Sequence, residues 1–358
     1  MSNSTHRFFA ASNSFDGFTS YFDKIFCPQE YEKIYILKGG PGTGKSSFMK
    51  AINNFFDDKP INTEIILCSS DPNSLDGLIL QNKTKKVAVI DGTSPHSAEP
   101  KYPGAVETIV NLGDFWNESV INSNREKILE LNAIKKQFYD NAYEYLSAAK
   151  VCSDIVYDSI KKIAAQKNEF ISQMLPKTVS GNGKIEIRLY SAFGKDGFTE
   201  LPIPCSDETK VYNFVGIYGS EYLFLETISE LAKADSLDLV ISPSPLDKTK
   251  YDCICVKEQN LIFKAGKGTT SKNATVIDTS KFINIKELEK IRNKVETLYK
   301  EKEALLWSAT DEFKRAYDTH INLEKIYSAA MNFKKNKRKI EKVCEEIESM
   351  LLESDINT

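Results

Sequence analysis

Arginine is scarce in this sequence. The 358 residues include 47 lysines and arginines, of which only six are arginines: Arg7, Arg125, Arg188, Arg292, Arg315 and Arg338. Because arginine is the usual bidentate partner of phosphate, each of the six is a candidate phosphate contact. The formal net charge is −3, so the overall electrostatics do not indicate a nucleic-acid-binding protein.

Long apolar runs and paired cysteine motifs are also missing. No stretch of 18 apolar residues occurs, and the start, Met1–Thr5, lacks the apolar segment of a secretion signal. The seven cysteines are scattered, with no C-x-x-C pair, which is typical of a reducing compartment. Cys253 and Cys255 have the spacing of a buried strand rather than of a metal site. These absences predict a cytoplasmic protein with no membrane association.

A glycine-rich stretch lies between the apolar run Ile34–Leu37 and the amphipathic segment Ser47–Phe56. It reads Gly39-Gly40-Pro41-Gly42-Thr43-Gly44-Lys45-Ser46, the G-x-x-x-x-G-K-S pattern of a Walker A loop. Glycines let successive backbone N–H groups point at a phosphate chain, and the following helix adds its free N–H groups and positive dipole end. This context predicts strand, loop and helix around a nucleotide rather than an ordinary glycine turn.

Individual roles follow from the pattern. We expect Gly39–Ser47 to cradle the phosphates of ATP, with Lys45 at the β- and γ-phosphates and the Ser46 hydroxyl on Mg²⁺. The later run Lys86–Asp91 is apolar and ends in an aspartate, as a Walker B strand does, so Asp91 is expected to hold Mg²⁺ through a water molecule. The next residue is a glycine and not the adjacent catalytic glutamate of many ATPases.

Three further polar residues are candidates for positioning the nucleophile. Ligands of open α/β sheets lie beyond the carboxyl ends of the strands. Asp71 follows the predicted strand Thr63–Cys68, where it orients a water, accepts a proton from a substrate or caps a turn. His96 and Glu99 lie in a proline-rich loop directly after the Walker B run, although loop histidines are more often structural. Asp76 is a weaker candidate in the same polar stretch as Asp71.

The segment before the glycine loop, Arg7–Phe26, is rich in aromatic residues. Packing of these rings onto the sheet is the favoured interpretation, and stacking on adenine is the alternative. Within the segment, Asp16–Thr19 has the composition of a turn that enters a short helix.

Two tracts show helical periodicity. From Asn117 to Leu175 most apolar residues recur at steps of three and four, which predicts one very long helix or a hairpin of two. A comparable tract spans Ile285–Leu352. Lysines along the first tract favour a solvated face, and an arm that binds a partner or nucleic acid is the alternative.

The second half of the chain repeats the first. Ordered matches recur at nearly constant spacing: Asp16–Thr19 with Asp196–Thr199, Lys33–Gly39 with Lys210–Gly216, and Leu146–Ala149 with Tyr327–Ala330. An internal duplication explains such spacing. We therefore predict an α/β fold of two tandem three-layer domains of the P-loop NTPase type, packed as an intramolecular pseudo-dimer. Their predicted ranges are 1–180, with a helical extension at 117–175, and 181–358, with a helical extension at 285–352.

The second copy has lost the phosphate-binding chemistry. Its glycine loop corresponds to Gly216–Leu223, and the expected replacements are Glu221 for Gly44, Tyr222 for Lys45 and Leu223 for Ser46. For the Walker B strand, Asn260–Ala265 has no aspartate, while Ala274–Asp278 has one that comes late. The second copy is thus expected to be a scaffold, a regulator or a substrate-binding half that does not hydrolyse nucleotide.

Three segments, Ile36–Ser46, Cys68–Gly77 and Asp91–His96, resemble a family of bacterial ATPases with two tandem P-loop halves. The resemblance covers nearly the whole chain and is strongest between Arg7 and Gly113. It implies ATP binding and a P-loop fold, and it does not imply a substrate. The second half of that family often keeps a loop lysine, which this chain lacks.

Three functions fit these observations. The first is an ATPase with a single competent site in the N-terminal half, which couples hydrolysis to movement of the helices or of the second half. The second is a small-molecule or nucleoside kinase with Ser69–Asp76 as acceptor site, which the scarcity of lid arginines disfavours. The third is a nucleotide-dependent interaction protein with little turnover. ATP is expected rather than GTP because no N-K-x-D guanine motif occurs; the protein or small-molecule substrate is not identified.

Overall fold

The protein forms two compact units. The structure, a computed structural model, describes residues 5–175, 181–266 and 273–352, so Met1–Ser4 of the N-terminal stretch discussed above lie outside the described residues. Unit 1 comprises Met1–Ala10, Ser20–Asp140 and Glu312–Thr358, and unit 2 comprises Ala11–Thr19 and Asn141–Asp311. No helix in the described ranges is long and apolar enough to cross a membrane.

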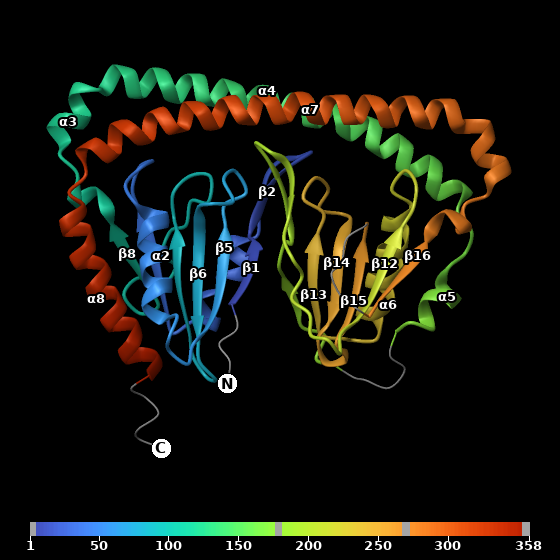
Figure 1. Ribbon diagram of the computed structural model, residues 1–358, viewed down its shortest axis with the longest axis horizontal. Helices are drawn as coiled ribbons and strands as arrows, with labels where there is room; N and C mark the ends of the chain where they lie inside the picture. Colours follow the sequence, from blue (N-terminus) through green and yellow to red (C-terminus); the bar gives the residue numbers. More distant parts are fainter. Residues whose placement is uncertain (1–4, 176–180, 267–272, 353–358) are drawn as a thin grey trace. The chain divides into compact units, whose positions relative to one another are not determined.

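Unit 1 is built on a six-stranded mixed sheet with the order β1-β5-β6-β7-β4-β8 (Figure 1). The strands are β1 Thr5–Phe9, β4 Lys33–Lys38, β5 Asn62–Leu67, β6 Leu75–Gln81, β7 Lys86–Asp91 and β8 Glu107–Asn111. The strand β4 pairs in parallel with β7 and β8, and β6 runs antiparallel to both of its neighbours. The carboxyl ends of β4, β5, β7 and β8 therefore meet the start of β6 at one edge of the sheet.

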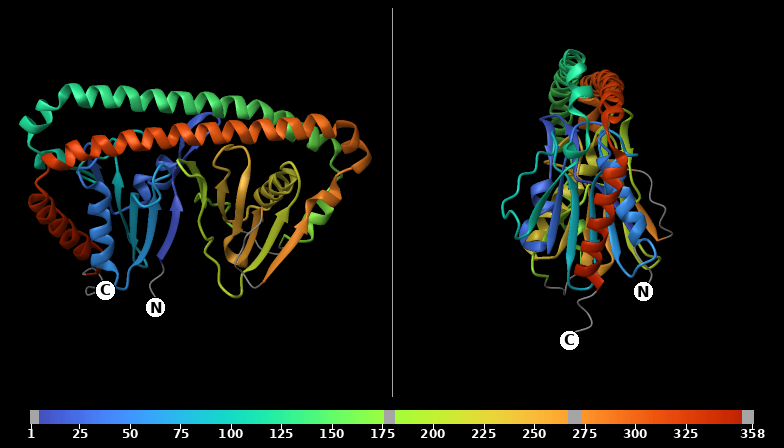
Figure 2. Two further views of the ribbon diagram at one scale, coloured as in Figure 1. Left: turned by 45° about the horizontal axis from the view of Figure 1, so that its top comes forward. Right: turned by 90° about the vertical axis from the view of Figure 1, so that its left-hand side faces the viewer.

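Helices cover the sheet of unit 1. They are α1 Phe22–Ile25, η1 Pro28–Glu30, α2 Lys45–Phe56, η2 Leu112–Phe115, α3 Glu118–Ser123 and α8 Phe333–Leu352. Apolar residues of α2 at helical spacing, Phe48, Met49, Ile52 and Phe56, are buried. Helix α8 lies beside α2 (Figure 2, right). The predicted strand, loop and helix around the glycine-rich stretch are thus present.

Unit 2 contains a second six-stranded sheet with the corresponding order β9-β13-β14-β15-β12-β16. Its strands are β9 Ile185–Ile187, β12 Lys210–Val215, β13 Leu239–Pro243, β14 Tyr251–Val256, β15 Leu261–Ala265 and β16 Ala274–Asp278. Its shorter helices are α5 Asn168–Ser172, α6 Ser220–Ala234, η3 Lys257–Gln259 and η4 Thr279–Phe282. Both sheets carry an irregularity at matching places, Ile66/Leu67 and Ser242/Pro243. The same strand order and the same irregularity agree with the predicted duplication.

Two hairpins also match between the copies. They are β2 Ala11–Ser14 with β3 Gly17–Ser20, and β10 Ser191–Gly194 with β11 Gly197–Glu200. In unit 2, Phe193 donates its N–H to the Ser12 hydroxyl at 2.9 Å, and Asn13 donates to the Phe193 carbonyl at 2.8 Å. The turn predicted at Asp16–Thr19 is therefore a hairpin turn, and the short helix begins only at Phe22.

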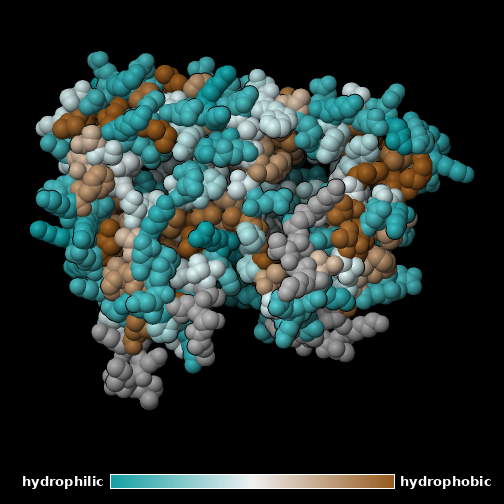
Figure 3. All heavy atoms as spheres, viewed as in Figure 1, coloured by the Kyte–Doolittle hydropathy of each residue, from teal (hydrophilic) through white to brown (hydrophobic). Residues whose placement is uncertain are grey.

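Two long helices carry the chain from one unit into the other. Helix α4, Arg125–Ile163, has 39 residues and α7, Ile285–Ala330, has 46. The first helical tract thus contains one very long helix, and the second contains α7 followed by α8. The predicted domains 1–180 and 181–358 follow the sequence repeat, whereas each compact unit also includes segments of the other half. Hydrophilic side chains prevail along the visible face of the long helices, with hydrophobic ones between them (Figure 3).

Candidate functional site

The glycine-rich loop joins β4 to α2 in unit 1. Gly42 and Gly44 have φ of 68° and 90°, in the left-handed region that glycine tolerates, and Gly44 is the N-cap of α2. The buried Thr43 donates its hydroxyl to the Gly40 carbonyl at 2.8 Å, which fixes the curve of the loop. The loop therefore turns through two conformations that favour glycine directly before α2 begins.

Lys45 folds back over this loop. Its ammonium donates to the carbonyls of Gly39 and Gly40 at 2.9 and 3.0 Å and lies 3.7 Å from Oδ2 of Asp91. Oδ1 of Asp91 accepts from the Thr93 N–H at 2.8 Å and from its hydroxyl at 2.6 Å. Burial raises the pKa of Asp91, and the nearby Lys45 counteracts this effect. The two side chains that the sequence assigns to phosphate and metal are therefore neighbours.

Ser46 begins α2 beside the start of β6. Its hydroxyl accepts the Leu75 N–H at 3.0 Å. Mg²⁺ prefers hard oxygen ligands and retains several waters, so the Ser46 hydroxyl and the Asp91 carboxylate are ligands of the right kind. Across the described part of the chain, no group of three or more His, Cys, Asp or Glu residues is placed to hold a metal ion. A metal here would thus depend on phosphate oxygens and water for its remaining ligands.

His96 and Asp76 form a buried pair at the same edge of the sheet. Nε2 of His96 lies 2.9 Å from Oδ2 of Asp76, and the imidazole stacks on Phe22 at 4.3 Å between ring centroids. The charge of Asp76 is close enough to raise the pKa of Asp91. His96 is thus brought to the site together with Asp76, which the sequence made only a weak candidate. The Phe22 ring is buried against His96. This agrees with the interpretation that the aromatic residues of Arg7–Phe26 pack within the protein.

Asp71 and Glu99 interact with residues other than Lys45 and Asp91. Asp71 accepts from the Ser74 hydroxyl at 3.0 Å and so shapes the turn before β6. In the second copy Asp247 makes the same kind of turn, because it accepts from the Thr249 N–H at 3.0 Å. Glu99 pairs with Lys38 at 2.6 Å and has a side chain that is 74% exposed. Among the described residues, Lys45 and Asp76, and neither of these two carboxylates, are the charges that act most on Asp91.

Gly92 occupies the position after Asp91 for a steric reason. A Cβ at this position would collide with Cγ2 of Ile36 on the neighbouring strand β4. Its N–H donates to the Leu37 carbonyl at 3.0 Å. A glutamate is therefore excluded where many ATPases carry their catalytic carboxylate.

The last turns of α7 lie against the glycine loop within unit 1. A Cβ on Gly40 would lie 2.9 Å from the Tyr327 ring, and one on Gly42 would collide with the backbone of Glu324. The hydrogen bond with His320 lowers the pKa of Glu324 most, and the charge of Lys45 and the Gly42 N–H, which the carboxylate accepts, lower it further. An anionic group of the chain itself thus contacts a loop N–H. The sequence gives no local signal of this contact, since the partners lie about 280 residues apart.

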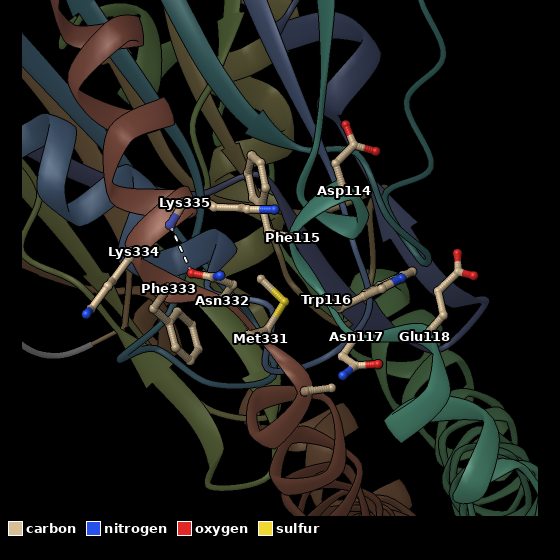
Figure 4. A pocket seen from close by; sticks show the side chains of 11 residues that line it. Asp114, Phe115, Trp116, Asn117, Glu118, Met331, Asn332, Phe333, Lys334 and Lys335 are labelled. Carbon is tan, nitrogen blue, oxygen red and sulfur yellow. Dashed lines mark hydrogen bonds between the residues drawn. The ribbon is translucent and has the colours of Figure 1, made fainter.

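A shallow hollow of about 660 Å³ borders the loop in unit 1 (Figure 4). It is lined by the η2–α3 segment on one side and the α7–α8 turn on the other, with Trp116 and Phe333 among its aromatic residues. Phe333 and Asn336 of α8 lie 3.4 and 3.2 Å from where a Cβ of Gly44 would stand. The hollow is therefore adjacent to the N-terminus of α2.

Three of the six arginines form ion pairs with glutamates rather than with groups of the candidate site. Arg188, Arg292 and Arg315 pair with glutamates close to them in sequence, Glu186, Glu289 and Glu312. For the described residues, no recorded arginine contact reaches the glycine loop or Asp91. The expectation of an arginine at the phosphates therefore stays a prediction.

The loop of the second copy differs in register from the prediction. Gly219, with φ of 83°, is the N-cap of α6 as Gly44 is of α2, so Ser220 and not Tyr222 stands in the place of Lys45. The predicted register is wrong by two residues because this loop is two residues shorter. Ser220 shares a hydrogen bond of 2.7 Å with the buried Thr279. The conclusion that this loop has no lysine for phosphate is unchanged.

Strand order also resolves the missing Walker B residue of the second copy. In the sheet β15 takes the place of β7, and β16 takes the place of β8. The strand β15, Leu261–Ala265, has no aspartate. Asp278, at the end of β16, therefore corresponds to Asn111 and not to Asp91.

Asp252 of unit 2 corresponds to Asp76, and its Oδ1 atom is buried. Burial raises the pKa of Asp252 to about 6. The Ser191 hydroxyl, which donates to Oδ2 of Asp252 at 2.6 Å, lowers this pKa and so offsets part of the effect of burial. A folded-state pKa above the unfolded value means that stability falls as the pH rises from about 4 to about 6 and stays lower above that. We expect Asp252→Asn to raise the free energy of unfolding by about 3 kcal/mol at pH 7.5 and to have little effect near pH 4. Urea denaturation at the two pH values measures this; an equal effect at both would contradict it.

Comparison with protein-family models, curated proteins and solved structures finds no match to this chain. The function must therefore be argued from the residues of the site.

Proposed function

We propose that unit 1 is a P-loop nucleoside triphosphatase that binds ATP and Mg²⁺ and hydrolyses ATP at one site. The observation that carries the proposal is the meeting of Lys45 and Asp91 at 3.7 Å, beside a loop with two left-handed glycines. The residues Gly39–Ser47 bind the phosphates, and Lys45 leaves its two loop carbonyls for the β- and γ-phosphates. The hollow next to Gly44 has the aromatic rings and the space to accept the nucleoside.

Different residues would bind the metal and position the attacking water. Ser46 and Asp91 would hold Mg²⁺, which neutralises charge on the transferred phosphoryl group when it is bound. The Asp76–His96 pair is the best-placed group to orient a water molecule, since Gly92 excludes a glutamate after Asp91. Asp76 fixes the ring through Nε2 of His96.

Phosphate release from ATP by the purified chain tests the proposal. We expect release with Mg²⁺ and none after chelation with EDTA, with no second substrate added. Labelled γ-phosphate that appears on a metabolite instead would favour the kinase alternative, in which the Asp76–His96 pair would be the base for an acceptor hydroxyl. Tight ATP binding without release would favour the interaction protein.

Glu324 provides a second prediction at this site. Its carboxylate occupies the Gly42 N–H, to which a phosphate oxygen would otherwise bind, and its negative charge opposes a phosphate there. We expect Glu324→Ala to tighten ATP binding about three- to tenfold. Titration calorimetry measures the affinity, and Asp318→Ala, at an exposed position of the same helix, is the matched control. Weaker binding by Glu324→Ala alone would show that the carboxylate supports the nucleotide rather than competes with it.

A further inference from the structure

Lys135 lies on the face of α4 that is turned toward the candidate site in unit 1. Leu131, Lys135 and Tyr139 are spaced by four residues and so share one face of the helix. Leu131 belongs to an apolar cluster with Leu323 of α7, against which Tyr327 also packs. Tyr327 in turn contacts Gly40 of the glycine loop. The Leu131 end of this helix face is therefore held above the carboxyl end of β4.

The other end of the face is anchored above β5. Tyr139 makes a hydrogen bond to Ser70, which follows β5 in the chain, and its ring contacts Phe313 at 5.7 Å between centroids. Eight helical residues rise about 12 Å. The three strand spacings from β4 to β5 measure about 14 Å. Lys135, halfway between the anchors, thus lies above β7 and β6, whose ends carry Asp91 and Asp76.

Lys135 differs from several other lysines of α4 in its ion pairing. Lys127, Lys136 and Lys150 of α4 each pair with an acidic residue within one turn, at 2.9, 2.6 and 3.5 Å. No ion pair of Lys135 is found among the residues that the structure describes. Burial lowers the pKa of Lys135, and the positive charge of Lys45 lowers it further. Two cations that repel each other in a partly desolvated place are stabilised by an anion between them.

We propose that Lys135 binds the terminal phosphate of the nucleotide, as a second cation opposite Lys45. The proposal rests on the proposed function and adds a residue from the helical extension to the site. Its ammonium would neutralise charge on the equatorial oxygens of the γ-phosphoryl group, where charge gathers during hydrolysis. A diphosphate lacks this group, so Lys135 distinguishes ATP from ADP.

The test compares Lys135→Met with Lys136→Met, which removes the adjacent lysine that pairs with Asp140 and is 76% exposed. Calorimetry gives the dissociation constants of ADP and of a non-hydrolysable ATP analogue, and phosphate release gives kcat. We expect Lys135→Met to weaken binding of the ATP analogue about ten- to hundredfold, with an ADP affinity within about threefold of wild type and a lower kcat. Lys136→Met should leave all three unchanged, and Lys135→Arg should retain the preference for ATP.

The outcomes separate this proposal from the proposed function. If wild type binds both nucleotides and Lys135→Met changes their affinities equally, or changes neither, Lys135 is not a phosphate ligand although the nucleotide site stands. If Lys135→Met unfolds, Lys135→Arg and Lys135→Gln replace it, and an unchanged ratio of ATP to ADP affinity in Lys135→Gln overturns the proposal. If wild type binds neither nucleotide, the proposed function fails, and the role of Lys135 fails with it.

Discussion

Lys45→Ala should lower the rate of phosphate release from ATP about a hundred- to thousandfold, because its ammonium is the group that we propose neutralises the β- and γ-phosphates. The side chain is largely buried over the loop, and its ammonium lies 3.7 Å from Oδ2 of Asp91. Its loss also removes an attraction for the nucleotide, so ATP affinity should fall. Steady-state phosphate release and calorimetry measure the two effects.

Lys50→Ala is the matched control for this substitution. Lys50 lies on the same helix, α2, and donates to the Asn73 carbonyl at 2.5 Å away from the loop. We expect wild-type turnover from Lys50→Ala and an unchanged melting temperature in both variants. Equal turnover in Lys45→Ala and wild type would show that hydrolysis, if observed, occurs elsewhere.

Asp91→Asn should reduce turnover about a hundredfold or more, since it removes the charge that we propose holds the metal beside Ser46. The amide keeps the size of the side chain and can accept from the Thr93 N–H and hydroxyl through its oxygen, so the turn after β7 should persist. The concentration of Mg²⁺ that gives half-maximal rate should rise as well. A magnesium titration of phosphate release measures both changes.

Asp57→Asn is the control for a carboxylate of the same unit outside the site. Asp57 follows α2 at the end opposite to the glycine loop, is exposed and accepts from the Asn53 amide at 3.2 Å. We expect the magnesium dependence of this variant to match wild type. A similar loss in both variants would indicate that general electrostatics, and not a metal ligand at Asp91, control turnover.

Sequence patterns predicted those parts of the candidate site whose residues lie close together in the sequence. The strand, the glycine loop and the start of α2 lie within about two dozen residues, and Asp91 follows an apolar run that forms β7. Hydrophobic pattern and glycine spacing act over such distances, so they can be read directly. The strand β6 was missed because Leu75-Asp76-Gly77 has the composition of a turn, and for that reason Asp76 was underrated.

The register of the second loop could not be obtained in the same way. Removal of two residues between β12 and α6 leaves the apolar pattern on both sides intact, and only the left-handed Gly219 marks the start of the helix. Lys135 and Glu324 were missed for a different reason. Glu324 contacts the loop, and Lys135 is close enough for the charge of Lys45 to lower its pKa, because α7 and α4 pack over this end of the sheet. Such long-range packing leaves no local sequence signal.

The number of ATP molecules bound per chain tests the central claim most directly. One copy retains Lys45, Ser46 and Asp91, while the other has Ser220 in place of the lysine and no aspartate at the end of β15. Calorimetric titration with Mg²⁺ and a non-hydrolysable ATP analogue should give one site per chain, and Lys45→Ala should abolish it. Two sites per chain, or one site that survives Lys45→Ala, would contradict the account.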